Sequence, residues 1–332
     1  MELRRLAKRS IPWVGSAMLL SYMAYTSDLD SIMASLRSVS LPGFFAVAVV
    51  ITLITFLTDA AGVRRVMAEV APGVSFKDAL TAKATSYILG IINYNAALAG
   101  MALFFKRSRG ASFWGTLGGL FTMNIADAVV LLMLMSVGLL ISSQELGLSS
   151  EFRRFVLLLS LGGLGAFIVG LSLLKGSLSL RPLRALREMS LIKPLISTTP
   201  SSWLQYFALR GLLVFEYMVS QWLFMCLFAI HVPFKLLVVY VPLTTFIQIV
   251  PISICGLGPT QLAMRELYTP FVTPSGLSPE AVVDAYSTAS IFGLLLFRIL
   301  LAWLFMGELS KQVLKESSRD ASAGATQGSS EG

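Results

Sequence analysis

Long apolar runs separated by short polar segments are the feature that most restricts what this 332-residue chain can fold into. About 20 consecutive apolar residues suffice for an α-helix to cross a bilayer, where backbone groups must be hydrogen-bonded within the protein. Only 13% of the residues are charged, against roughly 25% in a typical soluble domain. The sequence therefore predicts an all-α polytopic membrane protein and excludes an ordinary soluble domain.

Apolar regions recur along almost the whole chain. They cover residues 11–25, 41–61, 79–105, 113–141, 155–174, 203–230, 237–268 and 281–307. Six of these regions have the form of simple crossings. The other two, 79–105 and 237–268, are interrupted by polar, Gly or Pro residues. We expect each of these two to enter and leave the membrane on one side, as a re-entrant helical hairpin, which is tolerated where protein or a water-filled cavity surrounds the backbone.

The 26 Lys and Arg residues set the expected orientation, because cytoplasmic loops of membrane proteins are rich in them. The basic N-terminus, Arg64, Arg65, and the loop over residues 175–200 would then lie in the cytoplasm. If either interrupted region crossed the membrane completely, the enrichment of Lys and Arg on the cytoplasmic side would be weaker. We expect a cell inner (cytoplasmic) membrane protein with both termini cytoplasmic, a membrane domain over residues 1–310 and a polar, disordered tail over residues 311–332.

The first interrupted region, residues 79–105, is broken by Asn93, Tyr94 and Asn95, with Gly100 shortly after. Each half of the chain thus contains a pair of helices, an interrupted segment and a long following span, approached from opposite faces. This is the hydropathy outline of an inverted repeat, in which paired interrupted segments indicate the binding site of a transporter. Residue identity between the halves is almost nil, so the repeat is predicted from the pattern alone.

The second interrupted region contains the sequence PISICGLGP, residues 251–259. Pro251 removes a helical hydrogen bond, Gly256 and Gly258 permit a tight reversal, and Pro259 suits the first position of a new helix. The N-terminus of that helix would offer free N–H groups and partial positive charge to an anion, and Arg265 would add a full charge. A phosphate head group is the natural ligand. The alternative is that Gly and Pro only allow helices to kink or pack closely.

Other ionisable residues also lie inside apolar regions, where charge is costly and therefore a functional candidate by default. They are Asp127, Arg210, Glu216 and Arg298, to which Glu266 adds a fifth. Arg210 and Glu216 are six residues apart and point to different sides of a helix, so each needs a partner on another helix. Purely structural pairing is the alternative. Gly162, Ala166 and Gly170 form a stripe of small residues that predicts close helix packing.

The sequence VPISICGLGPTQLAMREL, residues 250–267, resembles the Pro-Ile-Ser…Gly-Leu-Gly…Arg-Glu signature of the transmembrane region of lysylphosphatidylglycerol synthases. The family also occurs as free-standing flippase-like proteins. The resemblance implies roles for Pro251, Gly256, Gly258, Arg265 and Glu266. It also implies an association with moving lipid between leaflets.

The first interrupted region departs from the family pattern, which has a Pro/Gly-rich turn followed by Arg. Here Asn93, Asn95 and Gly100 stand in place of the turn, and the basic group is displaced to Lys106. Family members that make aminoacylated lipid carry a cytosolic transferase. We expect none in this chain, so lipid synthesis does not follow from the resemblance.

We expect a transporter that moves an anionic phospholipid or a polyprenyl-phosphate-linked head group between leaflets. The expected binding residues are Asn93, Asn95, Asp127, Arg210, Glu216, Pro251, Gly256, Gly258, Arg265, Glu266 and Arg298. A small-anion secondary transporter and a membrane partner of a lipid-modifying enzyme are the alternatives. We expect no enzyme, cofactor, metal or nucleic-acid partner, because the sequence offers no nucleophile, His–acid pair, metal-ligand cluster or GxxxxGK[ST] loop.

Overall fold

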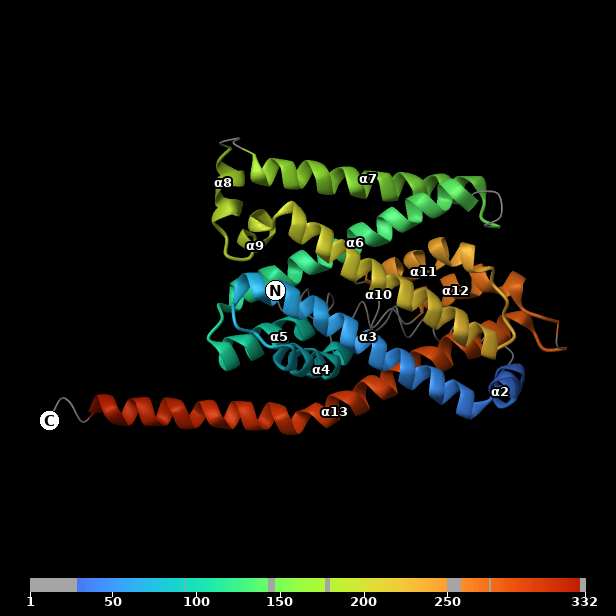
Figure 1. The fold of residues 1–332 in the computed structure, drawn as a ribbon. Coiled ribbons are helices and arrows are strands. Elements are labelled where there is room, and N and C mark those ends of the chain that lie inside the picture. The colour runs from blue at the N-terminus through green and yellow to red at the C-terminus, as the bar shows by residue number, and fades with distance from the viewer. Residues whose placement is uncertain are drawn as a thin grey trace, which may run out of the picture. The chain divides into compact units, whose positions relative to one another are not determined.

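The computed structural model describes residues 29–92, 94–142, 147–176, 180–249, 258–274 and 276–328. These residues form helices joined by short connections, with one isolated antiparallel bridge between Ile230 and Val272 (Figure 1). The helices are α2 (Leu29–Ser38), α3 (Leu41–Val70), α4 (Phe76–Ile92), α5 (Tyr94–Arg109), α6 (Phe113–Ser142), α7 (Ser150–Lys175), α8 (Arg181–Glu188), α9 (Lys193–Ser197), α10 (Pro200–Leu227), α11 (Phe234–Ile249), α12 (Pro259–Tyr268), the 3₁₀ turn η2 (Thr269–Phe271) and α13 (Pro279–Gly328).

Four of the described helices are long and apolar enough to cross a membrane. Their spans are Leu41–Val70, Phe113–Ile141, Ser150–Lys175 and Pro279–Phe305. The predicted region 11–25 lies outside the described residues. Helix α10 (Pro200–Leu227) covers most of the predicted region 203–230 and is not among the four. The prediction of an all-helical membrane protein is therefore confirmed at this level.

Two polar segments are helical. Helix α2 lies in the polar stretch between the predicted apolar regions 11–25 and 41–61, and its Asp30 stands in the first turn and Arg37 in the last. These charges complement the helix dipole, which stabilises the ends of a short helix. Helix α13 continues to Gly328, into the tail predicted to be disordered.

Ser and Thr side chains define the starts of several long helices, as the N-cap rules predict. The hydroxyl of Ser112 accepts a hydrogen bond from the Gly115 N–H at 3.3 Å, at the start of α6. At the start of α13, the hydroxyl of Ser278 accepts a hydrogen bond from the Ala281 N–H at 3.3 Å, and Pro279 is the first helical residue. The local sequence thus fixes where these spans begin.

The chain divides into two compact units, called unit 1 and unit 2 below. Unit 1 comprises residues 1–55, 126–172 and 207–296, and unit 2 comprises residues 56–125, 173–206 and 297–332. Unit 1 contains the α11–α12 pair and unit 2 contains the α4–α5 pair. Each unit therefore includes one of the two interrupted regions singled out in the sequence.

Unit 1 is packed around aromatic and β-branched side chains. The ring of Phe44 lies 5.1 Å from that of Phe224, centroid to centroid, which joins α3 to α10. Helix α6 contributes Val130 and Leu131 to a buried cluster with Val214 of α10. Burial of such side chains contributes about 1.5–3 kcal/mol each. The unit thus has its own apolar core.

In unit 2, α4 and α5 pack against each other as an antiparallel helical pair (Figure 1). A Cβ placed on Gly90 would lie 3.8 Å from that of Ala97, and one placed on Gly100 would meet the side chain of Leu89. The small residues on both helices therefore permit the close approach. Phe56 of α3, Ala84 of α4 and Leu301 of α13 form a buried cluster in the same unit.

The predicted packing stripe on α7 is wrong within the described residues. A Cβ placed on Gly162 or Gly170 would have no neighbouring atom within 4 Å. Gly163, one position along, is instead the close-packed residue, since a Cβ there would lie 2.7 Å from a methyl group of Leu132. The close contact on α7 therefore lies at a residue outside the predicted stripe.

Candidate anion-binding site

The start of α12 has the backbone geometry that the sequence predicted. Gly258 has φ of +95°, a left-handed conformation that glycine adopts without strain, and Pro259 is the first helical residue. Among the described residues, no side chain caps the first turn of α12 in the manner of Ser112 or Ser278. Instead, the Gln261 side-chain oxygen accepts a hydrogen bond from the Gly258 N–H at 3.3 Å. Pro251 and Gly256 lie outside the described residues.

Arg265 of α12 forms a two-pronged ion pair with Asp284 of α13. The Arg265 Nε donates to Asp284 Oδ1 at 3.1 Å, and a terminal guanidinium nitrogen donates to Asp284 Oδ2. The side chains are only 12% and 3% exposed. Parallel N–H···O bonds from a planar guanidinium to both oxygens of an oxyanion are among the strongest hydrogen bonds in proteins. The same donors fit two oxygens of a phosphate.

The sequence did not single out Asp284, although it singled out the acids Glu266 and Asp127 inside apolar regions. Glu266 is exposed, and Asp127 contacts Arg210. The signal that could have found Asp284 is its place in the apolar run AVVDAYS, since acids inside apolar segments are candidates by default. Its pairing with Arg265 depends on how α12 and α13 pack, which the sequence does not display.

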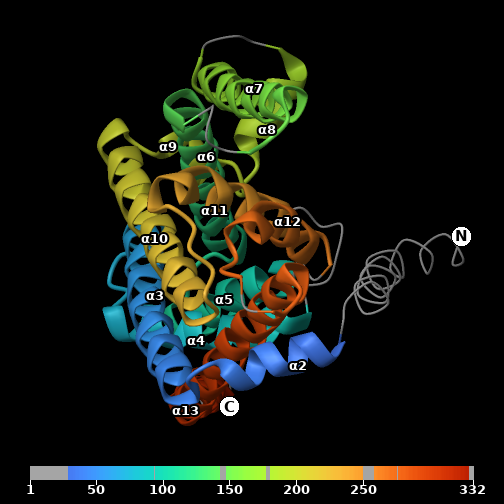
Figure 2. The ribbon, with the colours of Figure 1, turned by 90° about the vertical axis from the view of Figure 1, so that its right-hand side faces the viewer.

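Polar and aromatic residues surround this pair in unit 1. The Gln261 side-chain nitrogen donates to the Thr288 hydroxyl at 3.3 Å, which links α12 to α13 a second time. The Tyr268 hydroxyl donates to the Gln221 side-chain oxygen at 2.8 Å. The ring of Tyr268 also contacts those of Tyr240 and Tyr286, with centroids 5.9 and 6.1 Å apart. Side chains of α10, α11 and α13 thus contact α12. Figure 2 shows the ribbon of α11 beside that of α12.

A second ion pair in unit 1 joins Asp127 of α6 to Arg210 of α10, with 3.4 Å between Asp127 Oδ1 and Arg210 Nε. This confirms that Arg210 finds its partner on another helix. The Arg210 side chain is 4% exposed and that of Asp127 is 22% exposed. Glu216, on the same helix as Arg210, is buried as well. Both predicted charges of α10 therefore lie in the protein interior.

Unit 2 contains a different charged cluster around its hairpin. Lys83 of α4 lies 2.5 Å from Asp59 of α3, and the Lys83 ammonium is 5.4 Å from the centre of the Tyr87 ring. The guanidinium of Arg298, one of the predicted site residues, lies 5.6 Å from the centre of the same ring. Sequence reasoning found Arg298 but missed Asp59 and Lys83. Asn95 is exposed, and Asn93 lies outside the described residues.

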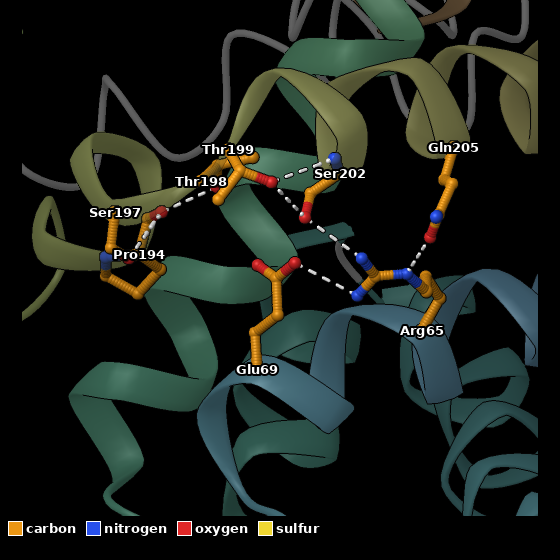
Figure 3. A network of polar contacts seen from close by, with 8 residues as sticks. All are labelled: Arg65, Glu69, Pro194, Ser197, Thr198, Thr199, Ser202 and Gln205. Atoms are coloured by element: carbon orange, nitrogen blue, oxygen red, sulfur yellow. Dashed lines mark hydrogen bonds and ion pairs between the residues drawn. The ribbon is translucent and has the colours of Figure 1, made fainter.

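The end of α3 carries a further polar network, which Figure 3 shows. Arg65 donates to Glu69 at 2.9 Å, to the Ser202 hydroxyl at 2.9 Å and to the Gln205 side-chain oxygen. Its guanidinium also lies 5.5 Å from the centre of the Tyr206 ring. This network joins α3 to the first turns of α10, so Arg65 stabilises the packing of these two helices.

Long apolar helices together with buried ion pairs define an α-helical integral membrane protein. The family model described as the lysylphosphatidylglycerol synthase TM region matches residues 11–302, and the chain belongs to this family. The match confirms the family that the segment over residues 250–267 resembles. No curated protein and no solved structure matches the chain.

Proposed function

We propose that the protein moves the phosphate-bearing head group of an anionic phospholipid, or of a polyprenyl-phosphate-linked lipid, between the two leaflets. The observation that carries this proposal is the buried Arg265–Asp284 pair at the interrupted segment. A carboxylate and a phosphate use the same guanidinium donors, so a lipid phosphate can replace Asp284 on Arg265 without leaving that cation unpaired. Asp284 would reclaim Arg265 when the head group departs.

We further propose that the α4–α5 and α11–α12 pairs are re-entrant hairpins of an inverted repeat, with six other segments crossing the inner membrane and both termini in the cytoplasm. The antiparallel packing of α4 on α5 supports a hairpin that returns to its side of entry. Movement would then come from rocking of one repeat against the other. We propose transport without a covalent step, because the buried ion pairs supply groups that bind an anion reversibly.

The topology can be tested by labelling single cysteines. Cys226 and Cys255 are first replaced by Ser, and a cysteine is then introduced at Ser108 or at Ser275. We expect a membrane-impermeant maleimide to reach residue 108 from the cytoplasmic side and residue 275 from the periplasmic side of oriented vesicles. Labelling of residue 108 from the periplasm would overturn the re-entrant arrangement of α4 and α5.

Transport can be tested in proteoliposomes with fluorescent phosphatidylglycerol, whose outer-leaflet fraction is bleached by dithionite. The double variant Arg265→Gln with Asp284→Asn removes both charges, so neither is left buried and unpaired. Loss of a charge-assisted two-pronged contact of roughly 3 kcal/mol should slow lipid movement about 100-fold. The matched control is Arg154→Gln, which removes an exposed charge from α7.

Wild-type rates in a correctly inserted double variant would contradict the proposal. Uptake of small soluble anions in place of lipid movement would favour the small-anion transporter, which the same interrupted helices could serve. Lipid movement that appears only with a separate lipid-modifying enzyme would favour a subunit of that enzyme. The three results are distinguishable in one set of vesicles.

A further inference from the structure

The ends of three candidate spans in unit 2 enclose a pocket of about 800 Å³. Val70 closes α3, Ser112 immediately precedes α6, and Lys175 closes α7, and all three residues line the pocket. The segment around α8 and α9 completes the wall with Arg187, Lys193 and their neighbours. Because the spans end here, the pocket lies at the depth where lipid head groups meet water.

Basic side chains give this pocket its charge. Lys175, Arg187 and Lys193 line it, and the single acid among the lining residues is Glu69. Glu69 already contacts Arg65 at 2.9 Å, so its charge is compensated. Within the described part of the chain, the three cations form no ion pair. The pocket therefore carries an excess of positive charge.

Two of these cations are held in place by neutral partners. Arg187 donates from Nε to the Leu174 carbonyl at 2.9 Å and from one terminal nitrogen to the carbonyls of Leu173 and Gly176 at 2.8 and 2.5 Å. Lys175 donates to the Thr198 carbonyl at 2.6 Å. The Arg187 bonds satisfy carbonyls at the C-terminal end of α7, and the Lys175 bond satisfies the carbonyl of the residue that follows α9. Carbonyls carry no net charge, so the pocket keeps the full charge of both side chains and further N–H donors.

The wall also has an apolar part that suits a lipid better than a free ion. Val70, Leu174 and Ile196 lie beside the charged residues. Leu186 and Met189, which flank Arg187 in the sequence, are 41% and 47% exposed. Exposed apolar side chains next to Lys and Arg are typical of segments that lie at a membrane surface. A lipid can satisfy both parts of this wall at once.

We infer that this pocket is an interfacial binding site for the phosphate-bearing head group of an anionic phospholipid. The site uses residues different from the Arg265–Asp284 pair, so it does not depend on the proposed function. The phosphate contacts Lys193, Lys175 and the uncommitted nitrogen of Arg187. The acyl chains extend along the neighbouring apolar surface.

The test measures binding rather than transport, on the full chain purified in detergent micelles. Fluorescent short-chain phosphatidylglycerol is titrated in the Arg265→Gln with Asp284→Asn background, so that the buried pair does not contribute. Lys193 is exposed, so Lys193→Gln should leave the fold intact. We expect about fivefold weaker binding for Lys193→Gln and a similar factor for Lys175→Gln. Lys106→Gln, an exposed lysine outside the pocket, is the matched control.

Lys193→Arg should bind the lipid about as tightly as the protein with Lys193, because it keeps the positive charge that Lys193→Gln removes. Unchanged affinity in the Lys193→Gln, Lys175→Gln double variant would overturn the inference. Equal loss for phosphatidylcholine would show that head-group charge is not recognised. Displacement of the lipid by equimolar inorganic phosphate would identify a free-anion site instead. Loss of transport with intact binding would bear on the proposed function alone.

Discussion

The two units hold their buried charges in different ways. In unit 1, Arg265 uses two nitrogens to bind both oxygens of Asp284. In unit 2, Lys83 makes a single contact with Asp59, and Arg298 lies against the same Tyr87 ring as Lys83. A planar guanidinium suits the exchange of one oxyanion for another, whereas an ammonium acts as a point charge. The difference supports the proposal that the Arg265–Asp284 pair exchanges one oxyanion for another, whereas Lys83 serves as a point charge.

The largest effect is expected from Lys83→Gln, which leaves Asp59 buried opposite a neutral side chain. Asp59 is 6% exposed, and breaking a buried pair by removing one partner costs about 3 kcal/mol or more. We expect a corresponding loss in the free energy of unfolding, measured by denaturant titration in micelles. The double variant Lys83→Gln with Asp59→Asn should recover most of it. Equal stability of the single and double variants would show that the pair is not buried as a unit.

A smaller effect on stability is expected from replacing one close-packed glycine in each unit by alanine. A Cβ on Gly118 of unit 2 would overlap the Leu191 carbonyl oxygen and lie 2.9 Å from its carbonyl carbon. Gly163 of unit 1 faces only the flexible end of the Leu132 side chain. Gly118→Ala should therefore cost about 2 kcal/mol of stability, while Gly163→Ala costs about 1 kcal/mol or less. Thermal unfolding of both variants checks this, and the reverse order would contradict the packing described for unit 2.

The smallest effect is expected from replacing Arg265 by lysine and Lys83 by arginine, measured as the rate of lipid movement. Arg265→Lys keeps the charge but loses the two-pronged contact, so lipid movement should fall about tenfold. Lys83→Arg keeps the charge of a side chain that acts as a point charge, and the rate should change less than about threefold. The dithionite assay measures both variants. Equal sensitivity of the two positions would remove the proposed division of roles.

Features governed by neighbouring residues were predictable from the sequence. Gly258 and Pro259 fix the start of α12, and Ser278 caps α13, because each effect operates within one turn of helix. The choice of ion-pair partner was not predictable. Arg265 contacts Asp284 rather than Glu266, because α13 packs against the face of α12 that carries Arg265. Glu266 lies on the exposed side of α12. Asp59 and Lys83 were missed for the same reason, being far apart in the sequence.

The helix packing of α7 shows a further limit. The small residues Gly162, Ala166 and Gly170 share a stripe, yet Gly163 is the residue that approaches α6. A pattern of small residues gives the spacing of a close contact but not the direction in which the helix is turned. That direction depends on the large residue opposite, here Leu132, which no local rule can identify.

The ion pair between Arg265 and Asp284 has a consequence for which anions can bind Arg265. A carboxylate fixed on a neighbouring helix competes for the guanidinium at an effective concentration in the millimolar range or above. Abundant monovalent ions such as chloride offer only one acceptor and would lose this competition. An oxyanion that presents two oxygens at once could win it. The protein would therefore bind the proposed phosphate-bearing head group without conducting chloride and similar ions across the membrane.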